Sequence, residues 1–247
     1  MNNTAIIVPA RLNSSRFPRK LLHPIAGKPL ILWTAERLKK EAKNWPLYFA
    51  VADEELRSLL QAHHFKIIMT RSELPSGTDR LAEANKRIEA EYVINVQADE
   101  PLVCAEQIQA LHDLIHQPGV DMATLATPFI SYSDFKDPNQ VKVVFSKNGK
   151  ALYFSRAPIP HMRSDESKVS PPPPKNAYRH LGLYAYRSNF LSHYNELNPS
   201  TYEALERLEQ LRALENGYAI AVGITHQPSI GIDTLEDALT WEAQIGV

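Results

Sequence analysis

The sequence has 247 residues, of which 44% are hydrophobic, and its formal net charge is −1 at pH 7. This length and composition suffice for a self-supporting core, and the near-zero charge excludes a global electrostatic attraction to nucleic acid or to an anionic membrane. We therefore expect any anion-binding site to be local, and we expect neither nucleic acid nor membrane as a partner.

Cysteine content and hydropathy both favour a cytoplasmic protein. The single cysteine, Cys104, has no partner within the chain, which agrees with a reducing compartment. No run approaches the roughly 18 apolar residues of a membrane span, and the first residues lack the basic start and apolar core of a signal peptide.

The first half of the chain alternates short apolar strands with amphipathic helices. The predicted strands cover residues 4–8, 47–53, 66–70 and 92–97, and the predicted helices cover 29–43, 54–64, 79–89 and 105–116. Such alternation is typical of a parallel, doubly wound α/β sheet.

The pattern changes after about residue 118. Strands are predicted at 122–129, 141–146, 150–156 and 180–187, at irregular intervals typical of a mixed sheet. The segment 164–176 is polar and contains four consecutive prolines, so we expect an exposed, extended loop, either a plain surface loop or a mobile flap. A helix over 202–216, a strand over 219–225 and a helix beginning near residue 233 complete the chain.

The loop after the first strand is unusually cationic. The stretch "PARLNSSRFPRK" places Arg11, Arg16, Arg19 and Lys20 among turn-forming residues, directly after a predicted strand. Ligands of open α/β sheets bind at the carboxyl ends of strands, and Arg and Lys hold phosphates by charge-assisted hydrogen bonds. An anion site is therefore the first hypothesis, with a solvated basic loop as the alternative, and neither standard nucleotide fingerprint is present.

Two acidic segments also follow predicted strands. In "NVQADEP" a strand leads directly into Asp99 and Glu100, and in "GIDTLED" Asp233 precedes the last helix. The two carboxylates of Asp99 and Glu100 at a strand end suit a hard cation such as Mg²⁺, which takes few protein ligands and keeps positions for substrate phosphates. The alternative is an acidic loop that simply faces water. Taken alone, Asp233 could equally be a helix N-cap with Glu236 completing a capping box.

Two other patterns do not indicate a site. His112 and His116 have the i, i+4 spacing of a helical zinc pair, but no H-E-x-x-H motif and no third ligand accompany them. Cys104 has no charged neighbour that would activate its thiol.

Several motifs together resemble one family over essentially the whole chain. They are "PARLNSSRFPRKLL", "MTRSELPSGTDRLAEA", "VINVQADEPLV", "DPNQVKVVF", "ALYFSRAPIP", "RHLGLYAYR", "LERLEQLRALENG" and "GIDTLEDA". In order and spacing they resemble the CMP-Kdo synthetases, which are 3-deoxy-manno-octulosonate cytidylyltransferases. The resemblance implies a Rossmann-like nucleotidyltransferase fold with a mixed sheet, and a small β-rich extension at about 130–190 used for sugar binding and homodimerisation.

The resemblance also implies an activity and its residues. The family couples CTP to Kdo with Mg²⁺ and releases pyrophosphate, for lipopolysaccharide biosynthesis. Residues matched to the family's motifs are, for the nucleotide, Arg11, Arg16, Lys20, Arg71, Ser76, Gly77, Thr78, Arg80 and Gln97; for the sugar, Gln97, Arg156, His180, Tyr184, Glu209 and Gln210; and for the metal, Asp99 and Asp233.

The implied chemistry needs no covalent nucleophile. The anomeric 2-hydroxyl of Kdo would attack the α-phosphorus of CTP while Mg²⁺ and the cationic loop, including Arg11 and Lys20, offset the phosphate charge. By family resemblance Arg156 would take the Kdo carboxylate. Without the resemblance, Tyr184 and Tyr186 would be interpreted as core aromatics, and "LERLEQLRALENG" as an ordinary amphipathic helix.

Four positions depart from the family pattern. Ala98 and Arg19 stand where glycine is usual, so each would be strained if its backbone needed a positive φ, and Arg19 could instead add a phosphate contact. His161 and Met162 replace a usual tryptophan–aspartate pair, which leaves 8-amino-Kdo or a sialic-type acid as an alternative substrate. A non-catalytic nucleotide-sugar binding protein is the other alternative, disfavoured by the presence of Lys20 with both aspartates.

Overall fold

The computed structural model describes residues 3–14, 16–74, 76–161 and 172–246. Part of the predicted proline-rich loop, together with Ser15, Pro75 and Met162, therefore lies outside the described residues. No described helix is long and apolar enough to cross a lipid bilayer.

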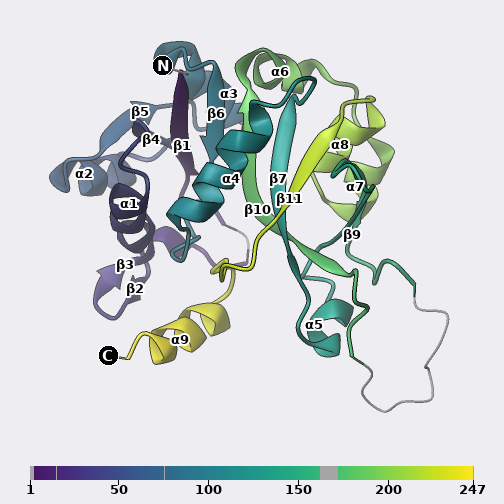
Figure 1. The fold of residues 1–247 in the computed structure, drawn as a ribbon. Coiled ribbons are helices and arrows are strands. Elements are labelled where there is room, and N and C mark those ends of the chain that lie inside the picture. Colours follow the sequence, from purple (N-terminus) through teal and green to yellow (C-terminus); the bar gives the residue numbers. More distant parts are fainter. Residues whose placement is uncertain (1–2, 15, 75, 162–171, 247) are drawn as a thin grey trace.

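The described residues form a mixed α/β fold around a nine-stranded sheet, which confirms the predicted fold class (Figure 1). Its main path has the order β11-β7-β10-β6-β1-β4-β5, and β8 and β9 continue from the far part of β10. The strands are β1 (Thr4–Ala10), β4 (Leu47–Val51), β5 (Lys66–Met69), β6 (Tyr92–Asn95), β7 (Met122–Pro128), β8 (Lys142–Phe145), β9 (Ala151–Ser155), β10 (Tyr178–Arg187) and β11 (Ile220–Ile224). A separate short hairpin joins β2 (Pro24–Ile25) and β3 (Lys28–Pro29).

Helices cover both faces of the sheet. They are α1 (Leu30–Glu41), α2 (Glu54–Ala62), α3 (Gly77–Ile88), α4 (Ala105–Ile115), α5 (Tyr132–Lys136), α6 (Ser188–His193), α7 (Thr201–Glu206), α8 (Gln210–Glu215) and α9 (Leu235–Gln244). Two short 3₁₀ segments, η1 (Lys20–Leu22) and η2 (Tyr194–Glu196), complete the element set.

The apolar residues of the central strands supply two cores, one on each face. Along β1, Ile6 and Val8 enter the core shared with α1, α2 and α4, whereas Ala5 and Ile7 enter the core shared with α3, α6 and α8. This alternation is the period of a β-strand, and burial on both faces explains why β1 is a continuous apolar run.

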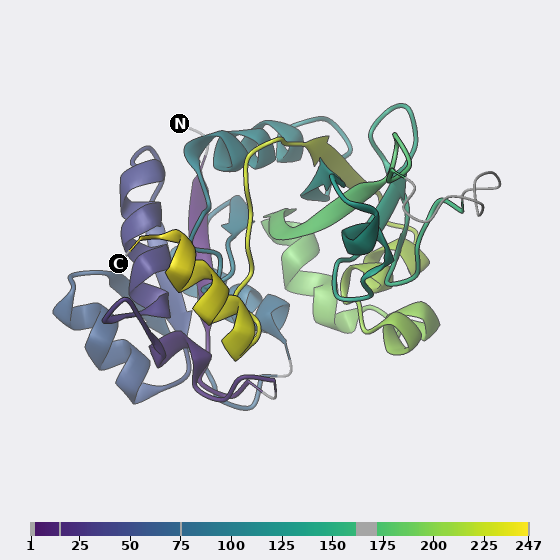
Figure 2. The same cartoon turned by 90° about the horizontal axis from the view of Figure 1, so that it is seen from below.

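The sheet is parallel on one side of β6 and mixed on the other, as the change of pattern after residue 118 predicts. β1 pairs in parallel with both β4 and β6, while β10 runs antiparallel to β6 and β7. After β11 the chain crosses the molecule to α9, which packs against β2 near the loop that follows β1 (Figure 2). This crossing brings residues from the two ends of the sequence to the same place.

The helix predicted over 202–216 is in fact two helices, so that prediction is wrong. α7 ends at Glu206 because Arg207 adopts a left-handed conformation with φ 53° and ψ 50°. α8 starts at Gln210 after a sharp corner. The corner faces the sheet and places residues 207–210 on the wall of a cavity.

Candidate functional site

The candidate site lies at the carboxyl ends of β1 and β6. The cationic loop follows β1, and Asp99 comes four residues after the end of β6. Because β1 and β6 are neighbouring parallel strands, their following loops emerge at the same edge of the sheet. The backbone N–H of Leu12 donates to the Asp53 carboxylate at 2.9 Å, which fixes the start of the cationic loop on the end of β4.

Lys20 lies between the two predicted metal-ligand carboxylates. Its Nζ donates to Asp99 Oδ2 and, at 2.9 Å, to Asp233 Oδ1. Arg16 Nη2 also lies 2.9 Å from Asp233 Oδ1. Burial opposes the Lys20 charge, but the two carboxylates outweigh it, so the pKa of Lys20 is raised. Burial likewise acts against the Asp233 carboxylate, yet Lys20 and Arg16 lower its pKa.

Asp233 is not the N-cap of the last helix, so the capping alternative is wrong. Thr234 is the cap: its side chain accepts from the Asp237 N–H at 3.1 Å, and the Asp237 carboxylate accepts from the Thr234 N–H at 2.8 Å. With the helix terminus satisfied by this capping box, the Asp233 side chain is available to the cations of the first loop.

A cavity of about 420 Å³ opens beside this cluster. Its wall combines the loop after β1, the first turn of α3, the residues after β6 and the corner before α8. Lining residues from these segments include Arg11, Asn13, Ser14, Arg16, Lys20, Gly77, Arg80, Gln97, Ala98, Asp99, Glu209 and Asp233. Concentrated cations beside backbone turns and a helix N-terminus suit a polyphosphate.

Arg80 is a buried arginine in this wall. Its side chain donates to the Thr70 hydroxyl and to the Arg71 carbonyl at 3.1 Å, while Nη2 has no hydrogen-bond partner within the described residues. Burial and the nearby Arg11 lower the pKa of Arg80. A buried guanidinium N–H without an acceptor is uncommon in proteins and costs free energy.

Three residues predicted near the nucleotide do not line this cavity: Arg71, Ser76 and Thr78, of which Thr78 lines a second cavity instead. Ser76 caps α3, accepting from the Asp79 N–H at 3.1 Å, and its own N–H donates to the Asp79 carboxylate at 3.0 Å. Arg71 is exposed and its Nε donates to Glu83 at 2.6 Å. In the free protein the side chains of Arg71 and Ser76 are both occupied by contacts within the chain.

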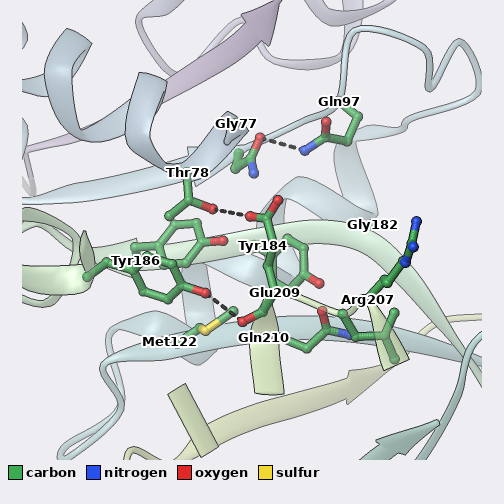
Figure 3. A pocket seen from close by; sticks show the side chains of 13 residues that line it. Gly77, Thr78, Gln97, Met122, Gly182, Tyr184, Tyr186, Arg207, Glu209 and Gln210 are labelled. Carbon is green, nitrogen blue, oxygen red and sulfur yellow. Dashed lines mark hydrogen bonds between the residues drawn. The ribbon is translucent and has the colours of Figure 1, made fainter. Parts of the chain in front are cut away.

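A second cavity of about 280 Å³ adjoins the first, and Gly77, Gln97 and Glu209 line both (Figure 3). Thr78 donates to the Glu209 carboxylate at 3.1 Å. Burial raises the pKa of Glu209, against the opposing effect of this hydrogen bond. Gln210 also lines the cavity, and its buried Nε2 has no partner within the described residues. Polar groups of this kind match a polyhydroxylated ligand.

Several residues that line the second cavity were not predicted from the sequence as site residues. They are Asn95, Met122, Gly182, Tyr186, Tyr194, Arg207 and Leu208. A signal existed for Asn95, which lies two positions before Gln97 and therefore shares its face, and the Gln97 side chain donates to Asn95 Oδ1 at 3.2 Å. Tyr184 and Tyr186 both line the cavity, so neither is solely a core aromatic.

Arg156 and His180 do not line either cavity. Arg156 Nε donates to the Glu206 carbonyl at 2.7 Å and Nη1 donates to the Pro138 carbonyl at 3.0 Å. His180 packs its ring against Phe154, and its Nε2 lies 3.0 Å from Thr124 Oγ1. Burial lowers the pKa of His180 to about 3. Arg156 instead holds the residue before Arg207, and His180 packs against the ring of Tyr184, so both side chains contact residues in or next to the cavity wall.

The departure at Arg19 has a clear structural consequence. Arg19 adopts φ 58° and ψ 24°, the left-handed region that glycine occupies without strain. Its guanidinium donates to both oxygens of Glu55, at 2.7 and 2.8 Å, and does not line the cavity. Ala98 has no positive φ, so alanine causes no such strain there.

The described residues contain no cluster of three or more His, Cys, Asp or Glu side chains placed to hold a metal. The His112 and His116 rings lie against each other in a tilted arrangement, with ring centroids 4.1 Å apart. A metal at Asp99 and Asp233 would therefore find no third ligand of these four residue types among the described residues.

Comparison with known proteins agrees with this geometry. The cytidylyltransferase family model matches residues 5–221. A 3-deoxy-manno-octulosonate cytidylyltransferase of Syntrophotalea carbinolica is 45% identical over 99% of both chains, and one of Neisseria meningitidis is 41% identical over 96% of both. A solved structure of a CMP:2-keto-3-deoxy-manno-octonic acid synthetase complexed with CTP is 36% identical, covers 98% of each chain and superposes with a TM-score of 0.87.

Proposed function

Because this chain belongs to the cytidylyltransferase family, we propose that it transfers CMP from CTP to the anomeric 2-hydroxyl of Kdo, giving CMP-Kdo and pyrophosphate for lipopolysaccharide biosynthesis. The observation that carries the proposal is the pair of adjoining cavities, one cationic and one polar and aromatic, which share Gly77, Gln97 and Glu209. A phosphorus atom in the first cavity and a hydroxyl in the second would meet at this shared wall.

The first cavity is the proposed CTP site. Arg11, Arg16 and Lys20 would contact the triphosphate, since all three line this cavity at the end of β1. The unpaired Nη2 of Arg80 and the Gln97 amide would serve the base, the ribose or the α-phosphate. The proposed contacts of Arg71 and Ser76 require that each leave its present partner.

Asp99 and Asp233 fit the proposed Mg²⁺. The protein already places a cation of its own, Lys20, between them. Two carboxylates are a short ligand set, which suits Mg²⁺ because it keeps several waters and takes oxygens from substrate phosphates. When bound, the ion would supply Lewis-acid stabilisation of charge on the phosphates.

The chain's own residues provide positioning and electrostatics. The acceptor hydroxyl oxygen would form a bond to the α-phosphorus and release its proton to solvent. At the same time the bond from the α-phosphorus to the oxygen that bridges the α and β phosphates would break, and negative charge would grow on the leaving pyrophosphate. Arg11 and Arg16 are placed to offset that charge. Thr78, Glu209 and Gln210 would hold the sugar hydroxyls, so that the reacting oxygen stays in line with the leaving group.

Arg207 is the proposed partner of the acceptor's carboxylate. It is the one cationic side chain among the described residues that line the second cavity, at the side away from Thr78 in Figure 3. Arg156 holds the backbone of this corner through the Glu206 carbonyl. In this arrangement Arg156 would contribute to acid recognition by positioning Arg207, and a direct contact would require Arg156 to leave its carbonyl partners.

A homodimer and a cytoplasmic location remain predictions. Two features support the dimer. Among the described strands β9 pairs only with β8, and Leu152 on β9 and Leu205 on α7 are 63% and 75% exposed. A second copy covering this part of the β-rich extension would remove apolar surface from water. Multi-angle light scattering of the wild type and of Leu152→Asp tests the assignment, and equal masses at the monomer value would contradict it.

Pyrophosphate release tests the proposed activity. The assay takes each of the four nucleoside triphosphates with Mg²⁺ and with Kdo, 8-amino-Kdo or N-acetylneuraminate. Release with CTP and Kdo supports the proposal, whereas release only with another acid moves the substrate, and no release with any pair favours a binding protein. Asp99→Ala and Asp233→Ala should each abolish Mg²⁺-dependent release, and near-normal activity in either variant contradicts its metal assignment.

A further inference from the structure

The ammonium group of Lys20 fills the space between Asp99 and Asp233. It donates to one oxygen of each carboxylate, and the Lys20 and Asp99 side chains are only 14% and 18% exposed. A divalent cation held between the same two carboxylates would lie in the space that this ammonium group occupies. Ammonium and metal ion therefore compete for one position, and both cannot occupy it.

The backbone under Lys20 is fixed, so the exchange must be made by the side chain alone. The Lys20 N–H donates to the Phe17 carbonyl at 3.2 Å, and the His23 N–H donates to the Lys20 carbonyl at 3.1 Å. The next residue, Leu21, is buried in the core with 4% exposure. The flexible four-carbon stem of lysine can move its charge without disturbing this segment.

Cations and carboxylates are equal in number at this contact, which lies beside the buried Glu100, whose pKa burial raises to about 7. Lys20 and Arg16 face Asp99 and Asp233, so two cations meet two carboxylates. Entry of a divalent cation with Lys20 in place would add unbalanced positive charge to a half-buried site. Arrival of a triphosphate in the adjoining cavity offers Lys20 another partner, because Lys20 lines that cavity as well.

We propose that Lys20 is an exchangeable counter-ion: it holds the two carboxylates together in the free protein, leaves them when a divalent cation enters, and then pairs with the nucleotide phosphates. The inference rests on the proposed metal site at Asp99 and Asp233. It makes metal binding and nucleotide binding cooperative, since the nucleotide draws away the group that blocks the metal, and this coupling is reciprocal.

Mn²⁺ binding without nucleotide tests the exchange directly. Electron paramagnetic resonance of free Mn²⁺ gives the affinity of the wild type, of Lys20→Met and, as a control, of Lys28→Met, which removes a lysine paired with Glu36 at 2.6 Å outside the site. Lys20→Met should bind Mn²⁺ more tightly than the wild type, by a factor within the roughly 5–150-fold range of site couplings, because the competing ammonium is gone. Lys28→Met should match the wild type.

Further variants distinguish an error in the proposed Lys20 exchange from an error in the proposed metal site. Adding Asp99→Asn to Lys20→Met should abolish the tighter Mn²⁺ binding, and Lys20→Arg, which keeps a cation, should bind Mn²⁺ as weakly as the wild type. Equal Mn²⁺ affinities for the wild type and Lys20→Met, both lost with Asp99→Asn, would overturn the exchange and keep the metal site. No Mn²⁺ binding in any variant would overturn both, while CTP-dependent pyrophosphate release by the wild type tests the proposed activity independently.

Two controls keep the result interpretable. Thermal melting shows whether Lys20→Met is folded. If it is not, Lys20→Gln replaces it, because glutamine is neutral but still forms hydrogen bonds.

With CTP present, the Mn²⁺ affinity of the wild type should rise more than that of the neutral Lys20 variant. An equal rise in both proteins would contradict the proposed coupling.

Discussion

Acidification should destabilise the fold through His180. The ring packs against Phe154 and Tyr184, with centroids 5.0 and 5.3 Å away. Burial lowers the pKa of His180 from 6.5 to about 3. In the unfolded chain the imidazole takes up a proton below pH 6.5, whereas in the folded protein it stays neutral. The unfolded state therefore binds more protons over this range, and the free energy of unfolding falls as the pH falls.

The size of this loss in the free energy of unfolding follows from the lowered pKa of His180. Each pH unit below 6.5 costs about 1.36 kcal/mol, so acidification to pH 4.5 should remove about 2–3 kcal/mol through this one group. His180→Gln cannot titrate. At pH 7.5 it should be less stable than the wild type by roughly 1–3 kcal/mol, because two aromatic contacts are lost. Near pH 4.5 this deficit should close.

Urea denaturation of both proteins at pH 7.5, 6.0 and 4.5 measures the difference. Carboxylates that titrate over the same range are common to both proteins and cancel in the comparison. His63→Gln, which removes an exposed imidazole at the end of α2, sets the baseline for loss of a histidine. A difference between wild type and His180→Gln that stays constant, or that widens towards low pH, would refute the reasoning.

Three other substitutions test single features. Asn85→Ala should lower the free energy of unfolding by about 2–3 kcal/mol in urea titrations, because it leaves the Ala90 N–H and carbonyl, now paired with the Asn85 amide at 3.1 and 3.0 Å, buried without partners. Arg207→Met should raise KM for the acid acceptor about tenfold or more and leave KM for CTP unchanged, consistent with loss of a charge-assisted hydrogen bond; equal changes in both constants would contradict the assignment. Arg19→Gly should raise the urea midpoint, since glycine relieves the left-handed strain at the expense of an exposed ion pair with Glu55.

The parallel half of the fold could be predicted because its signals are local. Each strand is a short apolar run, each helix shows one apolar face, and the boundaries of β4 and α2 differ from the predicted ones by two residues or fewer at each end. The mixed half offered weaker signals. The short helices α5 and α6 were missed, since five or six residues are too few to show a helical period.

The division of the predicted helix over 202–216 could not be found by periodicity. Apolar and charged residues keep a helical spacing through Arg207, and neither glycine nor proline marks the break. The left-handed conformation at Arg207 is stabilised from outside the segment, by Ser155 and Arg156 of the β9 region, which bind the Glu206 carboxylate at 2.6 and 2.8 Å. Contacts of about 50 residues' separation override local propensity here.

The sequence predicted which residues meet in the first cavity, but it did not predict the partner that each of their side chains takes. The strand-end rule and the family motifs both bring Arg11, Lys20 and Asp99 together, and the structure does so. Which partner each side chain takes depends on what else is bound. Arg156 is an example. Its guanidinium donates to backbone carbonyls, and no sequence motif indicates that it takes these partners.

The many cations in the loop after β1 serve two kinds of partner, the aspartates of the chain and, as proposed, the phosphates of the nucleotide. In the free protein Arg16 and Lys20 are neutralised by Asp99 and Asp233, which lie far along the chain, so only Arg11 and Arg80 face the cavity without a carboxylate partner among the described residues. A triphosphate alone would have to compete with the aspartates for Lys20, and a metal ion alone would have to compete with Lys20 for the aspartates. In the proposed exchange, triphosphate and metal ion together would replace each pair within the chain by a pair with a ligand, which would conserve the charge balance of a half-buried site. A loop with fewer cations could bind a phosphate, but it could not also neutralise the carboxylates of Asp99 and Asp233.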